Sequence, residues 1–122
     1  MFNYSIVSNS LIALIALLHI YILVLEMFLW DKPAGLKAFG HSQEMANLSK
    51  VLAANQGLYN GFLAAGLFWG LYLGSEGFHI KAFFLGCVLI AGIYGGITAK
   101  RKILYIQAAP ALAGLIALLL TI

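Results

Sequence analysis

Two ionisable residues, His19 and Glu26, lie inside a stretch of the sequence that is otherwise almost wholly apolar. The stretch covers residues 5–29, and the two residues are seven positions apart. On an α-helix this spacing is two turns, so both side chains share one face, about 10 Å apart along the axis. Ionisable groups inside a membrane helix are costly, and they usually mark a ligand site, a proton path or an internal ion pair. The pair predicts where chemistry takes place but not its substrate.

Further polar side chains are predicted to face this pair from the other apolar stretches. A helical wheel places four of them on one face of the second stretch, and Tyr94 and Gln107 on the inner faces of the third and fourth. Lipid cannot satisfy amides or a carboxylate, so these faces should turn toward the axis of a helical bundle. The expected ligand- or proton-binding pocket, open toward the cytoplasm, consists of His19, Glu26, Asn55, Gln56, Tyr59, Asn60, Tyr94 and Gln107.

Small residues continue the polar face of the second stretch toward its other end. Gly66, Gly70 and Gly74 repeat at four-residue spacing. Such a ladder lets helices approach closely, so we expect it to seal the pocket on the outer side.

The composition places these elements in lipid. The chain has 122 residues, of which 63% are hydrophobic and 9% charged, and its mean hydropathy is +0.99. A soluble domain of this size could not bury so much apolar surface. Each apolar stretch is long enough to cross a bilayer as a helix, which takes about 20 residues. The sequence predicts an all-α polytopic membrane protein, a single domain over residues 1–122 forming an antiparallel bundle of four transmembrane helices at about 5–29, 48–73, 78–99 and 103–122.

The basic residues predict the orientation of this bundle. Six of the seven lie on one side, in or beside the two connections that follow the first and third spans, and only Lys81 lies on the other. The positive-inside rule then places both termini outside a bacterial cytoplasmic membrane. The net charge of +3 comes mainly from residues 100–102, which we interpret as a topology signal and not as a nucleic-acid site.

Each polar feature also has a structural interpretation. Glu26 could form an ion pair with Lys50, and His19 could be a neutral buried histidine bonded to Asn60 or Gln56. In the connection after the first span, Asp31 could cap a short helix that Gly40 ends.

Two pairs of small residues allow close helix contacts. Gly57 and Gly61 form one pair, and Gly92 and Gly96 form the other. We expect internal helix contacts, with a homo-oligomer interface as the alternative.

The sequence contains no motif for a metal or a cofactor. HExxH, CxxC, GxSxG and phosphate-binding glycine loops do not occur. His19, His41 and His79 are predicted at three different depths, so they cannot converge on a metal or a haem. We therefore predict no metal, no cofactor and no catalytic residue set.

Several segments resemble a known family. They are HIYILVLEMFLW at 19–30, Pro33 with Gly35, KVLAANQGLYNGFLAAG at 50–66, Trp69-Gly70 and GIYG at 92–95. They are similar to a family of small bacterial four-span membrane proteins that is catalogued as a domain of unknown function, some of whose members are labelled epimerase. The similarity extends over nearly the whole chain, and ANQGLYNG is its most specific part. The resemblance implies four membrane helices and supplies no substrate.

Three functions fit these features. The first is a proton-coupled transporter or ligand-binding protein, because small multidrug transporters likewise combine four short helices with a carboxylate in the first. The second is an intramembrane enzyme acting on a lipid- or quinone-like substrate, with His19 and Glu26 as acid and base. The third is a structural or assembly subunit. The first is favoured, with an unknown small ligand and the lipid bilayer as partners.

Overall fold

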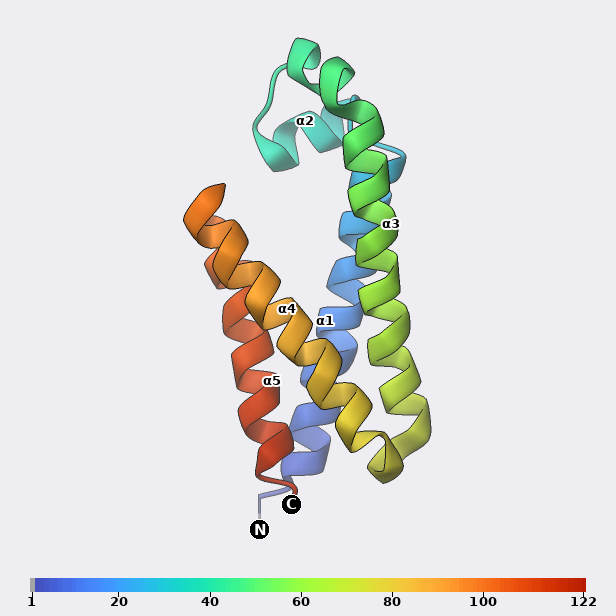
Figure 1. The fold of residues 1–122 in the computed structure, drawn as a ribbon, viewed down its shortest axis with the longest axis vertical. Coiled ribbons are helices and arrows are strands. Elements are labelled where there is room, and N and C mark those ends of the chain that lie inside the picture. The colour runs from blue at the N-terminus through green and yellow to red at the C-terminus, as the bar shows by residue number, and fades with distance from the viewer. Residues whose placement is uncertain (1) are drawn as a thin grey trace. The chain divides into compact units, whose positions relative to one another are not determined.

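Helices make up the whole architecture of the described part of the chain. The computed structural model describes residues 2–122, and within this range it contains no strand. The all-α prediction is therefore confirmed. The elements in order are α1 (Tyr4–Met27), α2 (Pro33–Phe39), α3 (Gln43–Leu73), the 3-10 turn η1 (Gly74–Gly77), α4 (Phe78–Thr98), the π-helical segment η2 (Leu104–Ala108) and α5 (Ala109–Leu119) (Figure 1).

Two helical stretches are long and apolar enough to cross a membrane. One is Tyr4–Met27, with 24 residues, and the other is Gln43–Thr98, with 56 residues. The second stretch reverses direction at η1, between α3 and α4 (Figure 1). A shorter apolar helix, Leu104–Leu119, follows.

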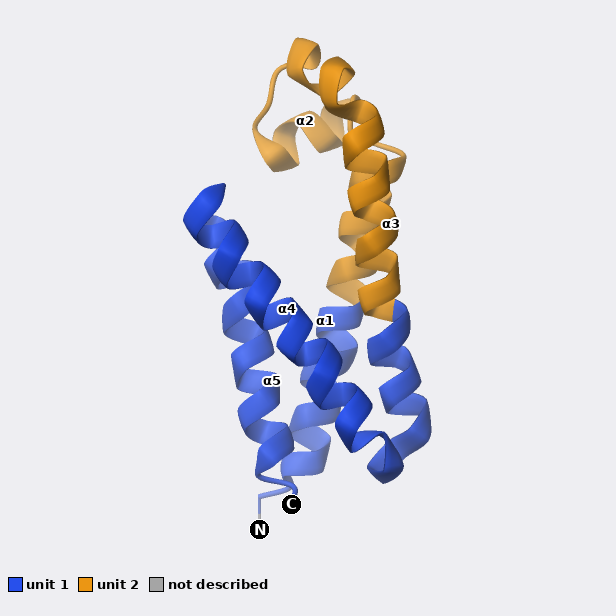
Figure 2. Ribbon diagram, in the orientation of Figure 1, with its two compact units in different colours: residues 1–16, 65–122 blue, residues 17–64 orange. Residues whose placement is uncertain are grey.

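Backbone contacts divide these helices into two compact units (Figure 2). Unit 1 comprises Met1–Ala16 and Ala65–Ile122, and unit 2 comprises Leu17–Ala64. Unit 2 buries the ionisable side chains of His19 and Glu26, and unit 1 buries that of Lys81, so the two units are described separately below.

Close contact between α1 and α3 organises unit 2. The buried residues of α3 within unit 2 are mostly small, and successive members lie seven, four, three and four residues apart: Ala46, Ala53, Gly57, Asn60 and Ala64. A Cβ atom added at Gly57 would lie 2.6 Å from Met27 Cγ and 3.2 Å from the Leu23 carbonyl oxygen of α1. The absence of a side chain at Gly57 therefore permits this approach, and Gly57 serves an internal contact. In the same way, the absence of a side chain at Gly61 permits close approach to the Leu23 side chain of α1.

Individual residues determine the conformation of the connection between α1 and α3. Pro33 begins α2, and Gly40 ends it with a φ of 68°, a left-handed conformation that glycine adopts without strain. The prediction that Asp31 caps this helix is wrong. Lys32 occupies the cap position without a side-chain bond, and the Asp31 carboxylate instead forms an ion pair with Lys50 at 3.0 Å.

An antiparallel hairpin of α4 with η2 and α5 forms much of unit 1. A Cβ atom at Gly92 would lie 2.6 Å from the backbone nitrogen of Ala108. Gly96 packs against Leu104, so these glycines also serve internal contacts. In the same unit the Phe84 ring occupies the space over Gly66.

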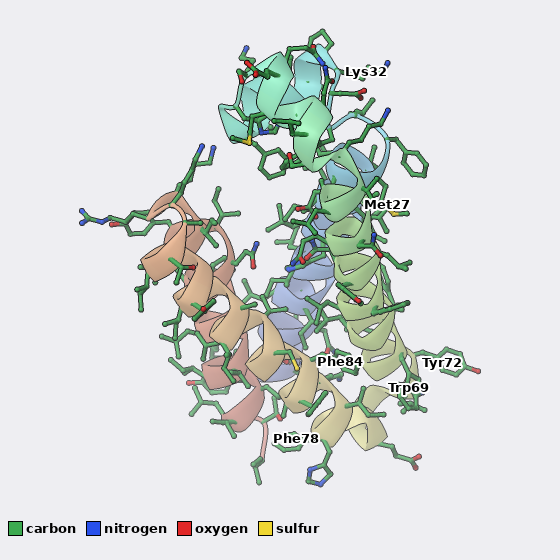
Figure 3. The ribbon with its side chains drawn as sticks, turned by 45° about the horizontal axis from the view of Figure 1, so that its top comes forward. Met27, Lys32, Trp69, Tyr72, Phe78 and Phe84 are labelled. Carbon is green, nitrogen blue, oxygen red and sulfur yellow. The ribbon has the colours of Figure 1, made fainter. Side chains whose placement is uncertain are left out.

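Large apolar side chains cover much of the outer surface of these helices. Leu48 is 78% exposed, Val51 76% and Ile97 76%. Near the end of α3, Trp69 and Tyr72 project outward from the ribbon (Figure 3). A surface of this kind is unfavourable in water and favourable in lipid.

Candidate functional site

Glu26 and Asn60 form a buried polar contact within unit 2. Asn60 Nδ2 donates a hydrogen bond of 2.6 Å to Glu26 Oε1. Each residue is only 8% exposed. The small residues around Asn60 bring α3 close enough to α1 for a short amide side chain to reach the carboxylate. The contact places a carboxyl group in an apolar helix with an amide as its hydrogen-bond partner.

His19 is completely buried on α1, two turns before Glu26. The seven-residue spacing puts the two side chains on one face, about 10 Å apart along the helix axis. A direct proton relay between them would need a bridging group. Unit 2 therefore contains two titratable side chains on one buried face.

The other polar residues predicted from α3 do not join Glu26. Asn55, Gln56 and Tyr59 are exposed, and Asn55 Nδ2 donates to the Val51 carbonyl oxygen of its own helix at 2.9 Å. The prediction that these residues line the pocket is wrong. The reason is that the closest helix approach occurs along the stripe containing Gly57, and of the polar side chains predicted from α3 only Asn60 lies on that stripe.

Tyr94 and Gln107 belong to unit 1. Tyr94 is 69% exposed, so its predicted place in a buried pocket is also wrong. Gln107 is half-buried within η2. A π-helical turn contains an extra residue, which rotates the following positions about the axis. Ala108, the residue after Gln107, meets Gly92 of α4.

The ion pair suggested between Glu26 and Lys50 is likewise not formed. Lys50 Nζ pairs with Asp31, because Lys50 lies ten residues before Asn60 and hence about 15 Å along α3 from the level of Glu26. The hydrogen bond from Lys50 holds the pKa of the Asp31 carboxyl below its usual range.

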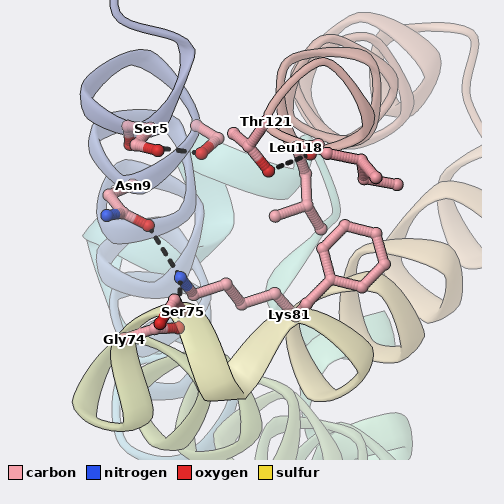
Figure 4. A pocket seen from close by; sticks show the side chains of 10 residues that line it. Ser5, Asn9, Gly74, Ser75, Lys81, Leu118 and Thr121 are labelled. Carbon is pink, nitrogen blue, oxygen red and sulfur yellow. Dashed lines mark hydrogen bonds between the residues drawn. The ribbon is translucent and has the colours of Figure 1, made fainter.

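A second polar site, in unit 1, was missed by the sequence reasoning. Lys81 is 4% exposed, and its Nζ donates to Asn9 Oδ1 and to the Gly74 carbonyl oxygen, each at 3.0 Å (Figure 4). The sequence analysis treated Lys81 only as a charge for topology. Its position inside the apolar stretch 78–99 was the available signal, since a charged residue there needs buried partners.

A cavity of about 340 Å³ adjoins Lys81. Its polar lining includes Ser5, Ser8, Asn9, Ser75 and Thr121, and its apolar lining includes Phe78 and Leu118 (Figure 4). Gly66 and Gly70 of the glycine ladder do permit close contacts, with Phe84 and Lys81, whereas the last member, Gly74, borders this cavity. Gly74 has a φ of 64°, so it ends α3 and turns the chain.

Among residues 2–122, no three His, Cys, Asp or Glu side chains gather closely enough to hold a metal ion. The fold and the two sites define an all-helical protein that buries a carboxyl in one compact unit and an ammonium in the other.

Comparison with known proteins assigns a family to the chain. The family model described as protein of unknown function (DUF1304) matches residues 13–119, and the chain belongs to this family. It is similar to the uncharacterized protein YpaA of Lactococcus lactis subsp. lactis (strain IL1403). The two are 31% identical over 105 residues, which cover 84% of this chain and 88% of YpaA. No solved structure matches the chain at a significant level.

Proposed function

We propose that the protein is a multi-pass protein of the bacterial cytoplasmic membrane with four spans: α1, α3, α4 and the helix formed by η2 and α5. A helical stretch of 56 residues that reverses at η1 supplies two crossings, because one crossing takes about 20 residues. The exposed Leu48, Val51 and Ile97 support lipid contact around these helices. The single four-helix domain is part of this proposal.

The proposed orientation places both termini outside the cell, since six of seven basic residues lie in or beside the other two connections. A cysteine at position 101, in a Cys87→Ser background, tests it. We expect a membrane-impermeant maleimide to label this cysteine only after the membrane is opened. Labelling of intact cells would overturn the orientation.

Within this membrane protein, Glu26 exchanges a proton while a ligand binds or crosses. The observation that carries the proposal is a carboxyl group that is 8% exposed and bonded to a neutral amide. An amide serves both charge states, because its N–H donates to a carboxylate and its oxygen accepts from a carboxylic acid. His19, fully buried on the same face of α1, is a second group able to take up a proton.

The chemistry of a buried carboxylate favours a cationic ligand, which would replace the proton. Proteoliposomes loaded with a pH-sensitive dye test this with tetraphenylphosphonium as the probe. We expect its addition to move protons across the wild-type membrane, and we expect Glu26→Gln to abolish the signal. The amide of glutamine has nearly the shape of the carboxyl but cannot exchange a proton at neutral pH.

Glu44→Gln is the matched control, since Glu44 is an exposed carboxylate in the same unit. It should behave as the wild type. If Glu26→Gln moved protons as well as the wild type does, Glu26 would serve helix–helix contact instead. If the folded wild-type protein moved no protons, the transport proposal would be overturned for this class of cation.

A further inference from the structure

The charged side chain that lines the cavity of unit 1 is positive. Lys81 is the charged side chain in its lining, and no aspartate or glutamate belongs to that lining. Glu76, next to Ser75 in the sequence, is exposed and does not line the cavity. A positive charge without a carboxylate partner in a largely apolar protein attracts anions strongly, because the surroundings screen it poorly.

Lys81 keeps one donor available for a ligand. An ammonium group carries three N–H bonds. Two of them are directed at Asn9 Oδ1 and the Gly74 carbonyl oxygen, which are both neutral acceptors. These bonds hold Nζ at the cavity (Figure 4), and they leave its charge uncompensated by any described side chain.

Other donors surround the ammonium group. Because Asn9 accepts from Lys81 through its oxygen, its Nδ2 amide group is turned to other partners. The Ser5 and Ser75 hydroxyls also line the cavity. The Ser8 and Thr121 hydroxyls donate to the backbone oxygens of Ser5 and Leu118 in this conformation. A ligand with several acceptor oxygens satisfies such a set better than a halide ion does.

The volume of the cavity and its apolar lining restrict the class of ligand further. A volume of about 340 Å³ is at the lower end of the range of about 300–1,000 Å³ for small-molecule sites. Phe78 and Leu118 supply an apolar side to the cavity, which inorganic phosphate would leave unused. We propose that this cavity binds a phosphate ester, with the phosphate oxygens on Lys81, Asn9 and Ser75 and the organic part against Phe78 and Leu118.

Such an ester can come from a phospholipid head group or from a free phosphate monoester, and two probes separate these sources. Native mass spectrometry of the purified protein with added phosphatidylglycerol measures lipid adducts. Calorimetry with sn-glycerol 3-phosphate measures the free ester. Phosphatidylcholine serves as a zwitterionic lipid control in the first measurement.

Three substitutions assign the binding to Lys81. Lys81→Met should weaken binding of the positive probe by about tenfold or more, which corresponds to about 1.4 kcal/mol, because a charge-assisted hydrogen bond is lost. Lys81→Arg keeps the charge and should keep most of the affinity. Arg101→Gln removes an exposed positive charge from the same unit and should bind as the wild type does.

Asn9→Asp keeps the test decisive if Lys81→Met fails to fold. Its new carboxylate would lie where Asn9 Oδ1 now accepts from Lys81 Nζ at 3.0 Å, so an internal ion pair would form. A structural role of Lys81 would be preserved or strengthened, whereas the phosphate ester would be repelled. We expect a folded protein that has lost binding of the probe.

Binding of either probe with this pattern of variants supports the site and identifies the source. Failure of both probes to bind the wild-type protein would overturn the proposal, as would equal binding by wild type and Asn9→Asp. None of these outcomes depends on proton exchange at Glu26, so the two proposals can fail separately.

Discussion

The two compact units hold their buried ionisable groups in different surroundings. In unit 2, Glu26 is bonded to Asn60 at a point where Gly57 brings α3 against α1. In unit 1, Lys81 is bonded to Asn9 and a backbone carbonyl beside a cavity. A buried carboxyl bonded to a neutral amide suits the exchange of a proton. An ammonium beside a cavity suits the binding of a larger anion.

The comparison teaches that burial of a charge does not by itself define a ligand site. Both groups are less than one tenth exposed. What differs is the local geometry: in unit 2 two antiparallel helices approach closely at Gly57, whereas in unit 1 the turn at η1 meets the first turns of α1 and the end of α5 and leaves a cavity. Four predictions test this difference, from the largest expected effect to the smallest.

The helix contacts of the two units should respond differently to one added methyl group. Gly92→Ala of unit 1 would press on the Ala108 backbone, whereas Gly57→Ala of unit 2 would press mainly on the Met27 side chain, which can move. We expect Gly92→Ala to destabilise by about 3 kcal/mol and Gly57→Ala by about 1 kcal/mol. Denaturation in detergent, followed by circular dichroism, measures both.

Gly86→Ala is the control for the helical preference of alanine, because no described atom lies within 4 Å of a Cβ there. It should stabilise α4 by roughly 0.5–1 kcal/mol. If Gly92→Ala were as favourable as Gly86→Ala, the close approach of α4 and η2 would be disproved.

Double-mutant cycles should couple Glu26 to Asn60 and not to Lys50. Asn60→Ala leaves a buried carboxylate without its donor, at a cost of about 1.5–3 kcal/mol, so its effect should change by more than about 0.5 kcal/mol when Glu26 is already Gln. Lys50→Met and Glu26→Gln should add within about 0.5 kcal/mol. Coupling of Glu26 to Lys50, with additivity between Glu26 and Asn60, would instead support a Glu26–Lys50 ion pair. It would contradict the buried hydrogen bond between Glu26 and Asn60.

The Trp30–Ser49 hydrogen bond should stabilise the connection between α1 and α3 in unit 2. Trp30 Nε1 donates to Ser49 Oγ at 3.0 Å, and the Trp30 ring contacts Phe39 and His41. Ser49→Ala and Trp30→Phe each remove this bond, and each should cost about 1 kcal/mol. Because both remove the same interaction, the double variant should cost less than the sum of the two. Thermal denaturation measures this, and full additivity would show that the bond contributes nothing.

The Asp31–Lys50 pair should give the smallest effect and a specific dependence on pH. The bond from Lys50 lowers the pKa of Asp31, so the pair stabilises the fold above the unfolded-state pKa of about 3.9. This contribution is lost as the pH falls through the lower, folded-state value. Since the Lys50 side chain is 58% exposed, salt should weaken it further.

Melting temperatures of wild type and Asp31→Asn between pH 7 and pH 2 provide the measurement. The wild type should be slightly more stable at pH 7, and the gap should close at the acidic end. Glu44→Gln, which changes an exposed carboxylate of α3, controls for the general loss of negative charge. A gap that widens in acid would contradict the ion pair.

Local sequence chemistry was sufficient for the elements themselves. The length and apolar character of each stretch predicted the helices, because a helix satisfies its own backbone whatever its neighbours are. Pro33 and Gly40 bounded α2 for the same local reason. The seven-residue spacing of His19 and Glu26 placed both on one helix face, and that face is buried.

Only the tertiary structure decided which faces meet. A helical wheel placed Asn55, Gln56, Tyr59 and Asn60 in the pocket alike. In the structure α3 approaches α1 most closely along its small side chains, and of these four residues only Asn60 lies on that stripe. Gln107 lies in the π-helical segment η2, which the apolar pattern of the fourth stretch did not predict. Lys81 depends on Asn9, 72 positions earlier in the chain, and no local pattern carries information about a contact of that range.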